Sequence, residues 1–240
     1  MMYREFFVKS TFGALLTIGM LVAGGGAVAE ENPRDPYEGF NRSMFAVNEV
    51  VDTYAAKPLA KVYDNVAPLP VKAAVGNFFG NTGELWVGVN SALQGKFADA
   101  GVDLGRLLIN STIGIFGLFD VASELGFERH DEDFGQTLAV WGVGDGGFVF
   151  WPVLGPRTVR DTAGWAGDFV VDPVRFFDPT GVRDVASIVR FLDVRASLLS
   201  SDRLVEEAAL DRYAYIRDAY LQRRRNQIFD GRPPRLDDDY

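Results

Sequence analysis

The segment WGVGDGGFVFWPVLGPRTVRD, from Trp141 to Asp161, mixes glycines, prolines and large apolar side chains and then ends in charged residues. Its glycines permit close backbone approach, and the run from Phe148 to Pro152 offers a broad apolar surface. An apolar wall beside fixed arginines suits an amphipathic ligand, whose apolar part needs a dry surface and whose anionic part needs hydrogen-bond donors. The candidate residues for such a site are Phe148, Phe150, Trp151, Pro152, Arg157, Arg160 and Asp161.

A second motif, DPYEGFNR at Asp35–Arg42, indicates an extended piece, a turn at Gly39 and the beginning of a helix. Asn41 is a suitable N-cap for that helix.

Both segments also have a simpler interpretation. The second motif would then be a structural cap whose aromatic side chains staple the first helix. The first segment would be a glycine-rich loop on the core, with the charges at its end paired locally.

Together the two motifs resemble the MlaA (VacJ) family, outer-membrane lipoproteins that remove mislocalised phospholipid from the outer leaflet. The resemblance covers nearly the whole chain that remains after signal cleavage, to about residue 225. It implies an all-α, compact, ring-like single domain embedded in the membrane. It implies that glycerophospholipid passes through an amphipathic channel to a periplasmic carrier of the MlaC type, which maintains lipid asymmetry. Trimeric porins are further partners that it implies. It implies no enzymatic reaction, catalytic residue, cofactor or metal ion.

The start of the chain has the features of a signal peptide. Arg4 and Lys9 form a short basic region, Phe12–Ala23 an apolar one, and Ala27–Ala29 a small-residue cleavage site. The apolar run is shorter than the roughly 20 residues that a membrane span needs. The sequence therefore predicts a cleaved signal over residues 1–29, a helical domain over 30–228 and a flexible acidic tail over 229–240.

The chain contains no cysteine. Members of the resembled family commonly carry a lipobox whose cysteine is lipidated, and here Gly25 stands where that cysteine would be. Acylation at that position is therefore chemically impossible. We expect the protein on the periplasmic side of the outer membrane, attached through its folded body or through a partner.

Composition and periodicity favour an acidic, helical protein. The formal net charge is −9 at pH 7, which argues against nucleic acid as a partner. Met44, Val47 and Val51 recur at helical spacing, whereas no alternating pattern is long enough for a membrane barrel. Chain breaks are expected at Lys57–Pro58 and at Pro68–Pro70. Further helices are expected at about 71–79, 84–93, 97–110, 117–125, 158–170, 181–199 and 203–228.

Two apolar segments, Leu85–Leu93 and Leu107–Phe119, are unusual because they contain Gly, Ser and Asn. Glycine within a helix in water costs about 1 kcal/mol relative to alanine, whereas in a bilayer small residues let helices pack closely. Buried core helices are the alternative; the resemblance favours membrane contact. The candidates for membrane contact are Leu85, Trp86, Val89, Ile113, Ile115 and Phe116.

The proline-containing stretch at residues 172–183 lies between two expected helices. In the resembled family a loop in this region borders the channel and governs its opening, although the match here is loose. A surface turn explains the prolines equally well. The candidate loop residues are Arg175, Phe176, Phe177 and Arg183.

The charged run Glu128–Asp133 contains His130, which is the only histidine of the chain. A Ser-His-Asp hydrolase would have to use it, but the sequence has no G-x-S-x-G motif, and a solvated turn is the simpler interpretation. The basic run Arg223–Arg225 suits either anionic head groups or the C-terminus of a helix. Alternatives to lipid removal are a soluble periplasmic lipid-binding module, a lipid hydrolase and a purely structural porin-associated protein.

Overall fold

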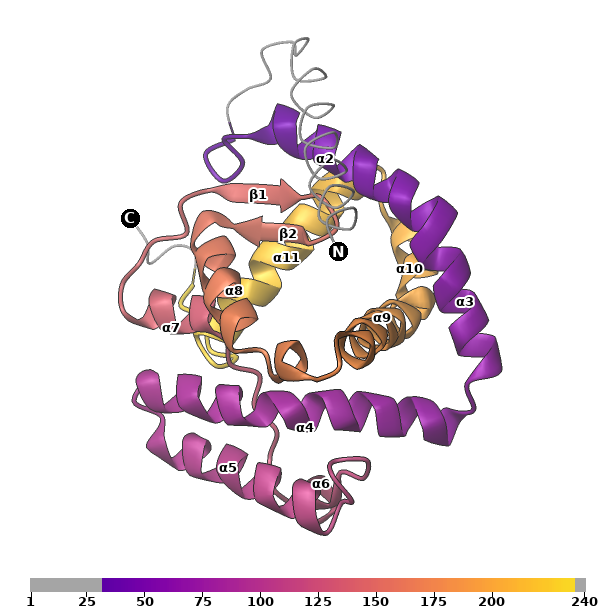
Figure 1. Cartoon of the computed structure of the whole chain (residues 1–240). Coiled ribbons are helices and arrows are strands. Elements are labelled where there is room, and N and C mark those ends of the chain that lie inside the picture. Colours follow the sequence, from indigo (N-terminus) through magenta and orange to yellow (C-terminus); the bar gives the residue numbers. More distant parts are fainter. Residues whose placement is uncertain (1–31, 236–240) are drawn as a thin grey trace.

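The computed structural model describes residues 32–235, so the expected signal peptide and residues 236–240 of the expected tail lie outside the described residues. Helices follow one another around a ring, one side of which includes a two-stranded sheet (Figure 1). This arrangement confirms the expected all-α, ring-like architecture. The elements are α2 (Glu38–Val51), η1 (Asp52–Ala56), α3 (Lys57–Val66), α4 (Leu69–Leu93), α5 (Phe97–Thr112), α6 (Val121–Glu124), α7 (Phe134–Val140), β1 (Phe148–Trp151), β2 (Gly155–Thr158), α8 (Val159–Val171), η2 (Pro173–Phe176), α9 (Thr180–Ser197), α10 (Leu199–Ala208) and α11 (Arg212–Ile228).

The first helical run continues from α2 through the π-helical η1 into α3. The expected break at Lys57–Pro58 is therefore wrong. A proline in a helix removes an N–H group and clashes with the preceding turn, and the wider π turn before Pro58 provides room for it. The expected break at Pro68 is confirmed, because Pro68 has extended backbone and precedes α4.

Asn41 lies inside α2 rather than at its N-cap, and it joins this helix to β1. Its Nδ2 donates to Oδ1 of Asp35 at 2.7 Å and to the carbonyl of Phe148 at 3.0 Å. Its Oδ1 accepts a hydrogen bond from the backbone N–H of Phe150 at 2.8 Å. The apolar core beside this junction consists of Met44, Phe148, Phe150 and Tyr213.

Strands β1 and β2 form an antiparallel hairpin that the sequence did not predict. Phe148 lies opposite Thr158, and Trp151 lies opposite Gly155. Other expectations also need correction. Residues 71–93 belong to one helix rather than two, the expected helix at 117–125 is reduced to the single turn of α6, and 203–228 is divided between α10 and α11. Helix α7 was not expected.

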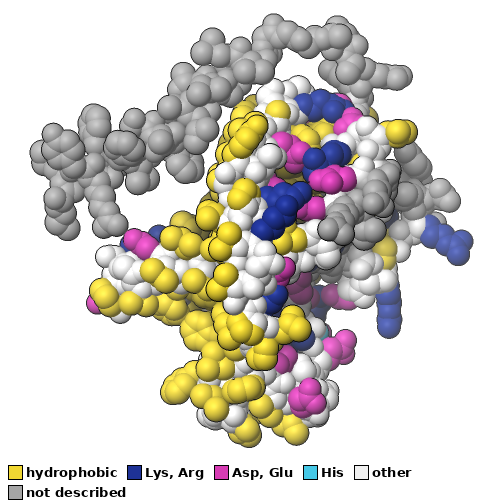
Figure 2. Space-filling model, turned by 90° about the vertical axis from the view of Figure 1, so that its right-hand side faces the viewer, with side chains coloured by type: hydrophobic (Ala, Val, Ile, Leu, Met, Phe, Trp, Pro, Cys, Tyr) yellow, Lys and Arg dark blue, Asp and Glu magenta, His cyan; other side chains and the backbone are white. Residues whose placement is uncertain are grey.

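The described part of the chain buries mainly polar side chains. Within residues 32–235, leaving out the undescribed side chains at 203, 204, 207 and 208, 17 polar or charged side chains are buried, compared with 10 hydrophobic ones. Many large hydrophobic side chains are exposed. Figure 2 shows hydrophobic side chains gathered along the left side and the lower part of one face, and most of the Lys and Arg side chains higher up. No described helix combines the length and the apolar character that crossing a bilayer requires.

Candidate functional site

Helix α9 exposes apolar side chains and bonds to its neighbours through polar ones. Val182, Val185, Ile188, Phe191 and Val194 recur every three residues and are 47–61% exposed. By contrast, the Tyr63 hydroxyl donates to Asp193 of α9 at 2.8 Å, and Arg190 donates to Asp172 at 2.9 Å. This is the reverse of a helix on a water-facing surface, which buries its apolar side chains. We call these five apolar residues the α9 band.

The turn between α5 and α6 exposes a second apolar surface. Ile115 and Phe116 are 54% and 76% exposed, and their φ angles are 52° and 56°. Left-handed backbone costs non-glycine residues roughly 1–2 kcal/mol each, so other contacts must hold the turn. One of them is the close packing of the Gly117 backbone on Asn81. The φ of Gly117 is 84°, and a Cβ atom at this position would lie only 2.6 Å from Asn81. Strained backbone that presents exposed apolar groups indicates a contact surface.

The remaining candidates for membrane contact differ in exposure. Ile113 is 65% exposed and Leu85 is 50% exposed, so both can contact lipid. Trp86 and Val89 are partly buried. The Trp86 indole donates to Oδ1 of Asp168 at 2.6 Å, which ties α4 to α8.

The apolar residues of the Trp141–Asp161 segment hold the hairpin on the body. Phe148 and Phe150 are 0% and 4% exposed, so these rings belong to the apolar core. Trp151 is partly buried, and its Nε1 donates to the Thr162 hydroxyl at 2.9 Å. Pro152 follows it at the end of the hairpin and is also partly buried.

Arg160 and Asp161 belong to a buried charge network. Nη2 of Arg160 donates to Oδ1 of Asp161 at 3.0 Å, while its Nη1 pairs with Asp145 at 2.5 Å. Asp161 also accepts from Arg224 at 2.9 Å and from the Tyr220 hydroxyl at 2.7 Å. Burial alone would raise the pKa of Asp161, but these donors and charges outweigh burial and lower it. The local pairing of the simpler interpretation is therefore present, within a larger network.

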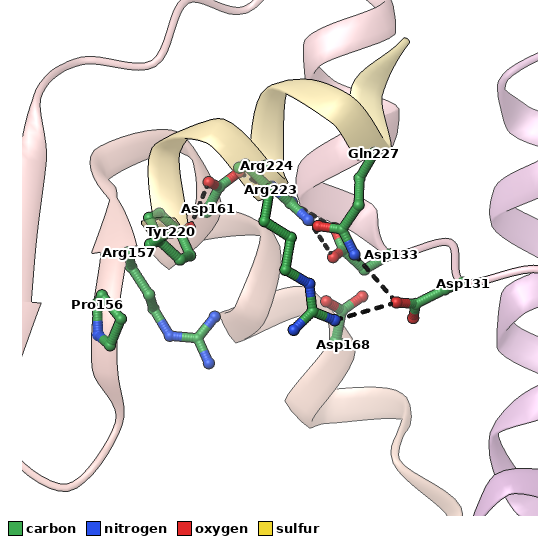
Figure 3. A pocket seen from close by; sticks show the side chains of 10 residues that line it. All are labelled: Asp131, Asp133, Pro156, Arg157, Asp161, Asp168, Tyr220, Arg223, Arg224 and Gln227. Carbon is green, nitrogen blue, oxygen red and sulfur yellow. Dashed lines mark hydrogen bonds and ion pairs between the residues drawn. The ribbon is translucent and has the colours of Figure 1, made fainter. Parts of the chain in front are cut away.

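Beside this network lies a cavity of about 250 Å³, formed by β2, α8, α11 and the segment before α7 (Figure 3). Arg157 lines it, and the centre of its guanidinium lies 5.4 Å from the Trp165 ring. Burial lowers the pKa of Arg157, and neighbouring carboxylates do not fully compensate. Figure 3 shows the side chains of Arg157, Arg223 and Asp168 around the same opening.

The structure thus brings two of the sequence-predicted residues, Arg157 and Asp161, to one cavity. Sequence reasoning missed the cavity residues Asp168 and Tyr220. Tyr220 and Arg224 lie four residues apart and therefore share a helix face, which was the available signal. Nothing in the sequence indicates that Asp168 points to the same space.

The candidate loop residues lie elsewhere in the described structure and do not line this cavity. Arg175 donates to the carbonyl of Phe169 at 3.0 Å and stacks on its ring at 4.0 Å. Phe176 is 73% exposed, whereas Phe177 is partly buried near Phe78. Arg183, in α9, pairs with its neighbour Asp184 at 3.5 Å.

The run Glu128–Asp133 is more engaged than a solvated turn, so that interpretation is wrong for part of it. Glu132 is buried and pairs with Lys96 at 2.8 Å. Asp133 caps α7 and receives both Nη atoms of Arg224 at 2.6 Å. The donor groups that hold Asp133 come from α7 and from α11, so this residue fastens the last helix to the body.

His130 does not have the partners of a catalytic triad. Its Nδ1 lies 2.6 Å from Oδ1 of Asp103, and the Ser91 hydroxyl donates to the other oxygen of Asp103 at 2.8 Å. In a triad the serine bonds to the histidine. In the basic run, Arg223 lies 3.6 Å from Asp131, Arg224 is buried, and Arg225 donates to the carbonyl of Pro234.

Several known proteins are similar to this chain. The model of the family described as MlaA lipoprotein matches residues 33–227. The intermembrane phospholipid transport system lipoprotein MlaA of Escherichia coli (strain K12) is 33% identical over 216 residues, which are 88% of this chain and 84% of that protein. An uncharacterized protein of Rickettsia bellii is 35% identical over 195 residues, or 81% and 76% of the two chains. A chain solved for the structural basis for maintenance of bacterial outer membrane lipid asymmetry matches with a TM-score of 0.71 and 32% identity, over 82% of this chain and 99% of that one.

Proposed function

Because the chain belongs to the MlaA lipoprotein family, we propose that it removes mislocalised phospholipid from the outer leaflet of the outer membrane and passes it to a periplasmic carrier. Relatives that carry the family name are described as parts of an intermembrane phospholipid transport system. The proposed carrier is of the MlaC type, and trimeric porins are the proposed partners in the membrane. Lipid transport by this route makes and breaks no covalent bond.

The observation that carries this proposal is the reversed distribution of polarity. The α9 band and the turn at residues 113–119 are exposed and apolar, while buried side chains are mainly polar and paired. Contiguous exposed apolar surface is unfavourable in water and is typical of sites that contact membranes or ligands. A ring with this distribution suits a lipid, whose tails follow apolar surface and whose head group follows polar groups. The mechanism is passive, and direction comes from the carrier that accepts the lipid.

The test uses cells that lack their own family member. Expression of this chain should lower the phospholipid of the outer leaflet, measured on intact cells with a membrane-impermeant amine-reactive reagent. Cells with an empty vector provide the baseline. Unchanged outer-leaflet phospholipid, with the protein present in the outer-membrane fraction, would refute lipid removal.

A soluble periplasmic lipid-binding module is the alternative, and the family relationship does not favour it. Carbonate extraction separates the two. An embedded protein stays in the membrane pellet, whereas a soluble module is released.

A further inference from the structure

The cavity beside α8 and α11 contains one positive and one negative side chain without an ionic partner among the described residues. The positive one is Arg157, whose Nε atom is buried and has no hydrogen-bond partner. The negative one is Asp168, which accepts hydrogen bonds from Trp86 and from the backbone of Phe134 but forms no ion pair within residues 32–235. Burial raises its pKa.

The other charges that line the cavity are already matched. Arg224 is shared between Asp133 and Asp161, and Arg223 faces Asp131. Tyr220 donates a further hydrogen bond to Asp161. What remains is one guanidinium and one carboxylate beside the same opening (Figure 3).

Arg157 and Asp168 are both partly buried, and a charge in such a position is destabilising when no ionic partner offsets its desolvation. Arg157 and Asp168 do not neutralise each other, since no ion pair joins them. A ligand with a charge of each sign would satisfy both at once. The volume of about 250 Å³ is several times the roughly 30 Å³ of a water molecule, which suits a small head group rather than acyl chains.

Building on the proposed function, we propose that this cavity binds a zwitterionic head group of the phosphoethanolamine type. The phosphate accepts hydrogen bonds from Arg157, whose planar fork matches phosphate oxygens. The ammonium group donates to Asp168. The Trp165 ring, 5.4 Å from the centre of the guanidinium, helps to keep it in place.

The test is calorimetric titration of the full chain in mild detergent with three soluble probes: glycerophosphoethanolamine, glycerophosphoglycerol and inorganic phosphate. We expect glycerophosphoethanolamine to bind about tenfold more tightly than the other two, because only it supplies a partner for Asp168. Arg157→Gln should abolish binding of all three probes. Asp168→Asn should remove the preference for glycerophosphoethanolamine over glycerophosphoglycerol.

A thermal or chemical denaturation measurement distinguishes a variant that has lost the binding site from one that has misfolded. Because this variant removes a partly buried charge that has no ionic partner among the described residues, the denaturation midpoint of Arg157→Gln should be unchanged or higher. The matched control is Arg190→Gln, which removes an arginine that lies over the Phe79 ring outside the cavity and should retain binding. Equal affinity for glycerophosphoethanolamine and glycerophosphoglycerol, or for glycerophosphoethanolamine and inorganic phosphate, would overturn the proposal, as would unchanged binding by Arg157→Gln. If any of these results is obtained while expression of the chain still lowers outer-leaflet phospholipid in cells, only this inference fails and the proposed function stands.

Discussion

Asn41 shows how one polar side chain can fix the position of a distant strand. It is fully buried and satisfies the backbone carbonyl of Phe148 and the backbone N–H of Phe150. Asn41→Ala would leave both groups buried without partners, at roughly 1–3 kcal/mol each. We expect the free energy of unfolding, measured by denaturant titration in mild detergent, to fall by about 2 kcal/mol or more. Asn65→Ala, at an exposed position of α3, should change it little, and an equal effect at both positions would contradict this role.

His130 should make stability depend on pH. Burial lowers its pKa, but the hydrogen bond to Asp103 and the charges of Asp103, Asp99 and Glu128 outweigh burial and raise it above the ordinary 6.5. A raised pKa means that protonated His130 stabilises the folded protein. This contribution is complete below the unfolded pKa and is lost as pH rises through the folded pKa.

The measurement compares the free energy of unfolding of the parent protein with that of His130→Asn, from a pH below the ordinary pKa of 6.5 to a pH above the raised pKa of the folded protein. The stability advantage of the parent should be largest at acidic pH and should shrink as pH rises. An advantage that is independent of pH would show that His130 contributes through packing or a neutral hydrogen bond instead.

Among the elements, those with strong helical periodicity were predicted well and those that depend on distant partners were not. Helices α5, α8 and α9 lie close to their expected bounds. The hairpin was missed because β1 is apolar at each position and shows no alternation, since three of its four side chains are buried. The break at Pro58 was wrong because helical periodicity does not reveal a π turn.

The candidate site was predicted only in part: the residues from one segment were found, and those from a distant helix were not. Arg157 and Asp161 follow from the apolar and charged character of one segment. The opposite wall of the cavity comes from α11, about 60 residues further along the chain than Asp161. Which residues of two distant helices face each other depends on tertiary packing, which a single sequence does not specify.

The α9 band provides a prediction at the scale of one element. Ile188 and Phe191 are 57% and 47% exposed, so replacing both with Glu should leave the helical content in mild detergent unchanged. In a bilayer, by contrast, each acidic group costs up to about 3 kcal/mol. The double variant should therefore shift from the membrane pellet to the supernatant during carbonate extraction. Gln222→Glu, on an exposed position of α11, is the control for added charge. Full membrane retention of the double variant would show that the α9 band does not contact lipid.

At the scale of the whole molecule, charged contacts join η1 and α3 to the much later helices α9 and α10. In Figure 1, α3 lies beside α9 and α10, and charged side chains connect η1 and α3 to these two helices. Nε and Nη2 of Arg195 donate to the two oxygens of Asp52 at 2.6 and 2.7 Å. The same guanidinium bonds to Asp202 at 2.8 Å, and Lys57 lies 3.0 Å from Asp202. These four residues therefore link segments about 140 residues apart in the sequence.

Because this link joins η1 and α3 to α9 and α10, weakening it should loosen that side of the molecule and leave the other side intact. A double-mutant cycle with Asp52→Asn and Arg195→Gln should give a coupling energy of roughly 1–3 kcal/mol, since the pair is bidentate and partly buried. Amide hydrogen exchange should become faster in α3 and α9 but not in α7 and α8, whose contacts do not include this link. If lipid passes through the ring, the single variants should also lose lipid removal while remaining in the membrane. A coupling energy near zero, with unchanged exchange rates in α3 and α9, would mean that small buried residues such as Ala60 of α3 hold these helices together through packing. The charges would then serve only as a local contact.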